Sequence, residues 1–176
     1  MNPKSAANAP LDAPARSFKA CTRYGRVHSV YDGDTIKVIT KLHKGEPWAL
    51  YSLRISDIDT PELRGPHREA GIAVRDALCL MLPKGCTVQL TLHKTDEDKF
   101  GRLLGSVRRC KWTNHFLTWK RYALADSVGV QLLALQLALP FDGKGKKIEW
   151  TAKQLAAALS SAQAYIDAAG GDSRVE

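Results

Sequence analysis

The sequence predicts an α+β fold in which five short β-strands close into a small barrel and helices pack against it. Segments rich in β-branched residues, with apolar and polar residues in alternation, recur between turn signals. One segment with helical periodicity is inserted between the third and fourth of these strands. The chain has 176 residues, 44% of them hydrophobic, which is enough for one core of this kind.

The alternation is clearest in the third strand, residues 49–55, where it places Arg54 on the face away from the core. The first two strands flank Asp32-Gly33-Asp34, a typical turn sequence. Beyond the fifth strand we expect a turn at residues 112–114 and a returning strand over 116–124. The five predicted strands are residues 26–31, 35–42, 49–55, 86–92 and 103–110.

Three helices are predicted. Residues 68–82 place apolar side chains on one side and are stopped by Pro83-Lys84-Gly85. A second helix starts near the potential cap Ser127, is apolar almost all round and should be buried up to Pro140. The last opens with Thr151-x-x-Gln154, a capping box, and runs to residue 171. Together these elements predict a five-stranded Greek-key β-barrel of the oligonucleotide-binding (OB) type.

The chain divides into a flexible N-terminal arm (residues 1–22), the barrel domain (23–143), and a linker with a C-terminal helix (144–176). The arm has no continuous apolar run of about 7–15 residues, so a secretory signal peptide is not predicted and an intracellular location is favoured. The longest apolar stretch, residues 128–141, is interrupted and too short to cross a bilayer core of about 30 Å. We therefore expect no membrane association, and a monomer.

The chain has four cysteines, at positions 21, 79, 86 and 110. None of them forms a Cys-x-x-Cys pair or has a histidine at zinc-finger spacing, which excludes a zinc finger. Their even number allows two disulfides. Without a secretory segment, four reduced thiols are the simpler interpretation.

The distribution of charge indicates nucleic acid as a candidate partner. The net charge of +8 resides in residues 1–141, because the remainder is balanced. Residues 107–121 hold basic side chains and two tryptophans but no acidic residue, a composition that suits a phosphate backbone and stacked bases. A solvated hairpin explains this segment equally well. The residues concerned are Arg108, Arg109, Lys111, Lys120 and Arg121, with Trp112 and Trp119.

Three motifs carry the chemical prediction: Asp32-Gly33-Asp34-Thr35, Arg54-(x4)-Asp59-Thr60-Pro61-Glu62, and Asp98-Lys99-Phe100-Gly101-Arg102. Each alone is common turn or surface chemistry. Together they contain the parts that a phosphodiester hydrolase needs.

Those parts have separate roles. Asp34 and Asp59 offer hard oxygen ligands for Ca²⁺ or Mg²⁺. Glu62 is a further carboxylate that could accept a proton from water. Arg54 and Arg102 supply planar forks that match phosphate oxygens.

In this order and with these gaps, the motifs resemble those of the staphylococcal (micrococcal, thermonuclease-type) nucleases, over about residues 26–143. The resemblance implies that the carboxylates of Asp34 and Asp59 and the backbone carbonyl of Thr60 bind one Ca²⁺, with Mg²⁺ as the other candidate, and that Asp32 lies beside the metal. It also implies that Glu62 is the general base or orients water. Arg54 and Arg102 would contact the reacting phosphate. The implied activity is cleavage of DNA and RNA with little sequence preference, leaving 3′-phosphates.

The resemblance further implies substrate contacts at Lys99, Phe100 and Phe141, and both phenylalanines stand where family members often carry tyrosines. It does not cover the C-terminal helix. The alternative function is a catalytically inactive OB module that binds nucleic acid. The joint presence of Glu62, two aspartates and two arginines favours the enzyme, because a binding module does not need them all.

Overall fold

The computed structural model describes residues 21–43, 45–93, 101–115, 118–123, 126–142 and 149–171, and gives only the backbone for 112–115 and 118–123. The expectations for residues 1–20, for Lys99 and Phe100, and for the linker at 144–148 fall outside these residues.

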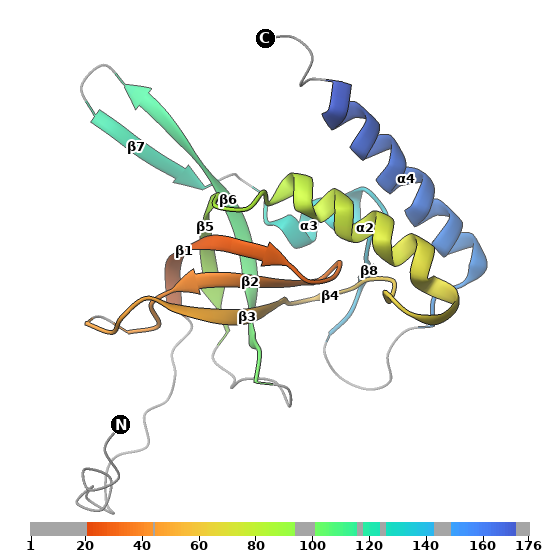
Figure 1. Cartoon of the computed structure of the whole chain (residues 1–176), viewed down its shortest axis with the longest axis horizontal. Coiled ribbons are helices and arrows are strands. Elements are labelled where there is room, and N and C mark those ends of the chain that lie inside the picture. The colour runs from red at the N-terminus through yellow and green to blue at the C-terminus, as the bar shows by residue number, and fades with distance from the viewer. Residues whose placement is uncertain are drawn as a thin grey trace, which may run out of the picture.

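Five strands close into a ring in the order β1-β2-β3-β6-β5 (Figure 1). Neighbouring strands are antiparallel except where β3 and β6 close the ring, with Leu53 opposite Leu103 in a parallel pair. The predicted α+β fold with five strands in a closed arrangement is therefore confirmed. The ring strands are β1 (Cys21–Val30), β2 (Thr35–Thr40), β3 (Ala49–Ile55), β5 (Thr87–Leu92) and β6 (Leu103–His115).

The core fills the ring and extends beneath the helices. On β5, every second side chain is buried, as the alternating sequence requires. Helix α2 (Arg68–Met81) buries one stripe against the sheet, and α4 (Ala152–Gly171) packs along α2 (Figure 1). Ala158 and Ala162 are fully buried on α4, and their small side chains suit close approach to a neighbouring helix.

Strand β6 is longer than predicted, because it continues to His115 and pairs with β7 (Thr118–Ala123). The expected turn at residues 112–114 is wrong, since these residues form β-strand and Trp112 pairs with Arg121. Tryptophan and threonine favour extended backbone, which agrees with this pairing. The resulting ribbon projects from the ring (Figure 1).

Helix α3 (Val128–Ala134) is shorter than predicted. Its cap is confirmed, because the Ser127 hydroxyl accepts a hydrogen bond from the Val130 backbone N–H at 3.4 Å. The helix does not reach Pro140, since Gln136 adopts a left-handed φ of 59°, and it is buried on one side only, with Val130 52% exposed. Leu139–Pro140 instead forms β8, which pairs with β4 (Ile58–Asp59).

The capping box that opens α4 is confirmed. The Thr151 N–H donates to Gln154 Oε1 at 2.9 Å, and the Gln154 N–H donates to Thr151 Oγ1 at 3.3 Å. Within the described part of the chain, no helix is both long and apolar enough to span a bilayer. All four cysteines are free, and burial raises the pKa of the Cys79 and Cys86 thiols, which favours the unreactive protonated form.

Candidate active site

The β1–β2 turn brings the first motif against the second. Asp32 shapes the turn by accepting a hydrogen bond from the Asp34 N–H at 3.2 Å. Gly33 lies so close to the second motif that a Cβ there would be 2.7 Å from Thr60 Oγ1 and 2.9 Å from a methyl carbon of Val74 on α2. Only glycine fits this contact without displacement of its neighbours.

Asp34 is buried at the start of β2 and is held by several donors. Its Oδ1 accepts hydrogen bonds from the Thr35 hydroxyl at 3.0 Å and from Arg54 Nη1 at 2.8 Å. Burial raises the pKa of Asp34 to about 7, and the negative charges of Asp32 and Asp59 add to this effect while Arg54 opposes it. Burial is therefore the main reason why the protonated form of Asp34 is favoured, although Arg54 stabilises the charged form.

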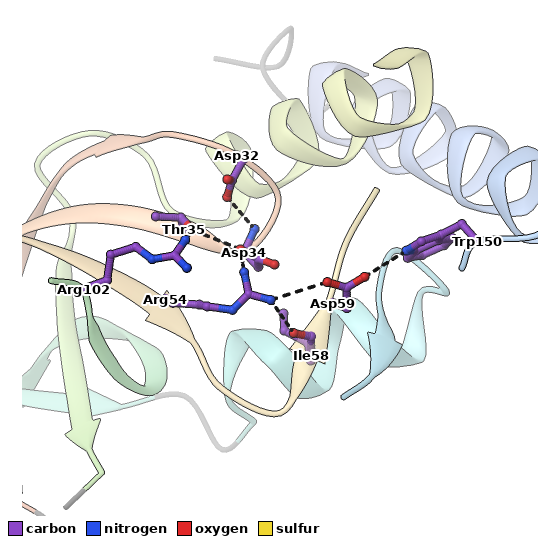
Figure 2. Close-up of polar contacts among 8 residues, drawn as sticks. All are labelled: Asp32, Asp34, Thr35, Arg54, Ile58, Asp59, Arg102 and Trp150. Carbon is purple, nitrogen blue, oxygen red and sulfur yellow. Dashed lines mark hydrogen bonds and ion pairs between the residues drawn. The ribbon is translucent and has the colours of Figure 1, made fainter. Parts of the chain in front are cut away.

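Arg54 joins two motifs through one guanidinium. It lies opposite Thr35 in the β2–β3 register and points away from the core, as the alternation of β3 predicts. Its Nη1 contacts Asp34, and its Nη2 lies 3.5 Å from Asp59 Oδ1 and 3.4 Å from the Ile58 carbonyl oxygen. Figure 2 shows the guanidinium between the two carboxylates.

Asp59 is fully buried on β4, and its backbone is fixed by pairing with β8. Its second oxygen, Oδ2, accepts a hydrogen bond from Nε1 of Trp150 at 3.2 Å (Figure 2). Trp150 is also buried and directly precedes the capping box of α4. The C-terminal helix is thus tied to a predicted metal ligand.

Sequence reasoning missed Trp150. A large apolar residue just before an N-cap is a signal for packing against the helix, but it does not identify a polar partner 91 residues away.

The donor set fits a hard divalent cation. Asp34 and Asp59 provide two buried carboxylates that reach the same guanidinium, and Thr60 is buried beside them. Among the described residues, no three His, Cys, Asp or Glu side chains cluster closely enough to bind a metal, so a cation here would also need carbonyl and water oxygens. Burial and the neighbouring carboxylates disfavour the charged form of Asp34, and a divalent cation would stabilise that form.

Glu62 is exposed on the segment that leads from Thr60 toward the short helix η1 (Gly65–His67). Helix α2 packs tightly on the backbone of this segment, because a Cβ at Gly71 would lie 2.7 Å from the Glu62 carbonyl carbon. The backbone of Glu62 is therefore fixed three residues after Asp59, while its side chain is exposed to solvent.

Arg102, just before β6, enters the same network from the third motif. Its Nη1 donates to the Thr35 hydroxyl at 3.3 Å, and that hydroxyl in turn donates to Asp34 (Figure 2). The structure thus brings all three motifs together. Lys99 and Phe100 of the third motif lie outside the described residues.

Phe141 lies near Arg54. Its N–H donates to the Asp57 carbonyl oxygen at 3.1 Å. It lines a cavity of about 180 Å³ together with Arg54, Asp57 and His93. Phe141 is therefore near the candidate site, and its ring offers no hydroxyl for a phosphate.

The basic segment 107–121 has a partly structural role. Arg109 Nη1 donates to the carbonyl oxygen of Met81, the last residue of α2, where a cation also opposes the negative end of the helix dipole. Lys111 is exposed. The side chains of Trp112, Trp119, Lys120 and Arg121 lie outside the described residues, so the expected stacking role stays a prediction.

Comparisons with known proteins find no family model and no curated protein that matches this chain at a significant level. Function is therefore inferred from the motifs and from the geometry described above.

Proposed function

We propose that this chain is a metal-dependent nuclease that hydrolyses phosphodiester bonds of DNA, RNA or both. The strongest support is the convergence of the three motifs, in which Arg54 bridges Asp34 and Asp59 while Arg102 reaches Asp34 through Thr35. If each motif were only a turn or a surface ion pair, nothing would require them to meet.

The metal would be Ca²⁺, with Mg²⁺ as the other candidate, held by the carboxylates of Asp34 and Asp59 and the carbonyl oxygen of Thr60. When bound, it supplies Lewis-acid polarisation of the phosphate. The arginines and Glu62 supply the rest of the chemistry.

Arg54 and Arg102 would bind the non-bridging phosphate oxygens and stabilise the charge that develops there in the transition state. Arg54 suits this role because Asp34 fixes its orientation before substrate binds. Glu62 would accept the proton of the attacking water. The new bond joins that water oxygen to phosphorus, the bond to the 5′ oxygen breaks, and the leaving oxygen takes a proton from solvent.

Little sequence preference is expected, because these groups contact phosphate and not base edges. The products would carry a 3′-phosphate and a 5′-hydroxyl, as the resemblance of the motifs implies.

The test is cleavage of single-stranded DNA, double-stranded DNA and RNA by the purified protein in Ca²⁺, in Mg²⁺ and in chelator. Cleavage should require the metal, and Glu62→Gln should lower turnover by roughly 10²–10⁴-fold, the usual loss when a general base is removed. The matched control is Glu69→Gln, which changes an exposed glutamate in the first turn of α2.

Near wild-type turnover of Glu62→Gln in saturating Ca²⁺ would remove Glu62 from the reaction. Binding of nucleic acid without any cleavage would support the inactive binding module instead.

A further inference from the structure

A groove of about 370 Å³ lies on the outer face of the ring, beside the candidate active site. It is lined by Tyr31, Thr35, Lys37, Ser52 and Arg102. Its volume is within the range of small-ligand sites, roughly 300–1,000 Å³. Thr35 and Arg102 belong both to this groove and to the network around Asp34, so the two are continuous.

The strand register explains why these residues share one face. Thr35 and Lys37 are two residues apart on β2, so both point outward, and roughly 7 Å separates them along the strand. Ser52 lies opposite Lys37 on β3. The Tyr31 N–H donates to the Thr35 carbonyl oxygen at 2.9 Å, which fixes the backbone of Tyr31 at the end of the groove.

The chemistry of the lining is that of a nucleotide site. Tyr31 is 59% exposed, so its ring offers an aromatic face to solvent. Lys37 is an exposed cation, and none of the described residues that line the groove is acidic. An aromatic face beside a lysine and an arginine suits a stacked base with its flanking phosphates.

We propose that this groove is a subsite for the nucleotide next to the scissile phosphate, with its base stacked on Tyr31 and its phosphate paired with Lys37. Stacking needs a base with an open face, which a single strand has and a duplex lacks, so the subsite selects single-stranded nucleic acid. The position relative to the scissile phosphate rests on the proposed function; the binding of an unpaired base does not.

The test measures binding of a short fluorescent single-stranded DNA by anisotropy, with chelator present so that no cleavage occurs. Tyr31→Ala should weaken binding about tenfold, the effect of losing one stacked base, whereas Tyr31→Phe should stay within about twofold because the ring remains. Lys37→Gln should reduce the slope of log affinity against log salt by about 0.7, the share of one phosphate contact to a single strand.

Two matched controls separate the groove from general surface effects. Tyr24→Ala removes another exposed tyrosine, 45% exposed and seven residues back along the chain, on β1. Lys84→Gln removes an exposed lysine in the turn between α2 and β5. Both variants should bind like the wild type.

A scan with one abasic position moved along the oligonucleotide locates the stacked base. The wild type should lose affinity sharply at one position, and Tyr31→Ala should no longer distinguish that position from its neighbours. An identical abasic profile for the two proteins, equal affinity for duplex and single strand, or no binding by the wild type would overturn the subsite.

Failure of the proposed function is recognised separately. A wild-type protein that never cleaves in Ca²⁺ or Mg²⁺ but keeps the Tyr31-dependent abasic profile would overturn the nuclease and support the subsite. Cleavage that is unaffected by Tyr31→Ala, together with an unchanged profile, would overturn the subsite and support the nuclease.

Discussion

Replacing Trp150 by phenylalanine should weaken both the fold and the candidate metal site. The substitution keeps an aromatic ring at the start of α4 but removes the N–H that donates to Asp59 Oδ2 at 3.2 Å. Both side chains are buried, so water cannot easily replace the lost donor.

The size of the effect follows from these contacts. A hydrogen bond to a charged group contributes about 1.5–3 kcal/mol to the free energy of unfolding. The smaller ring also leaves space in a packed region, which adds to the loss. We expect Trp150→Phe to lower the free energy of unfolding by about 2–4 kcal/mol. Trp48→Phe is the matched control, and because Trp48 is 61% exposed its effect should stay within about 0.5 kcal/mol.

The assay is urea unfolding followed by circular dichroism, in a double-mutant cycle of Trp150→Phe with Asp59→Ala. The cycle cancels the packing losses of the single variants and leaves the coupling between the two side chains. A coupling of at least 1 kcal/mol is expected. If the two effects simply add, to within about 0.5 kcal/mol, the hydrogen bond does not connect α4 to Asp59 and this reasoning fails.

Two further predictions concern Asp34 and Gly33. Because the pKa of Asp34 is raised from 3.8 to about 7 on folding, the folded state binds more protons between these values, so without divalent cations the protein should lose stability as pH rises from 4 to 7. Urea unfolding at several pH values, with Asp34→Asn as the variant that flattens the profile, checks the sign; stability that rises through this window because of Asp34 would contradict it. Gly33→Ala should lower the free energy of unfolding by about 1–3 kcal/mol, because the methyl group would collide with Thr60 and Val74. Gly33 does not have a left-handed φ, so the cost there comes from the collision, and an unchanged free energy of unfolding for Gly33→Ala in urea would contradict this prediction.

Much of the fold could be predicted from local patterns. Alternation over residues 49–55 marks which side chains face the core, and it correctly places Arg54 outside. Hydrophobicity is less informative where a helix and a non-helical segment would bury the same residues. Leu137 and Ala138 are buried as the prediction of a continuous helix requires, but they lie in the bend between α3 and β8. The returning strand predicted over residues 116–124 agrees with β7, but the turn predicted at 112–114 is wrong, because local sequence does not show how far the pairing of the two strands extends.

The candidate site likewise contains residues that sequence motifs identify and residues that only tertiary contacts identify. Within each of the three motifs the residues are close in sequence, so their types and spacing can be recognised directly. Trp150 and Tyr31 could not be recognised in this way. The importance of Trp150 comes from one contact across 91 residues, and that of Tyr31 comes from the side chains that the strand register places beside it.

Burial of two carboxylates at the candidate site costs free energy, which the surrounding structure must offset. Asp34 and Asp59 share one arginine in a buried setting, and burial opposes the charged form of Asp34. Two carboxylates so arranged would move apart unless the framework held them in place. Gly33 against Thr60, the β4–β8 pair and the Trp150 hydrogen bond provide that restraint from three directions. A fold that restrains like charges in this way loses stability without a cation and regains it when one binds. The same restraint would keep these oxygens oriented for the divalent cation that the proposed function requires.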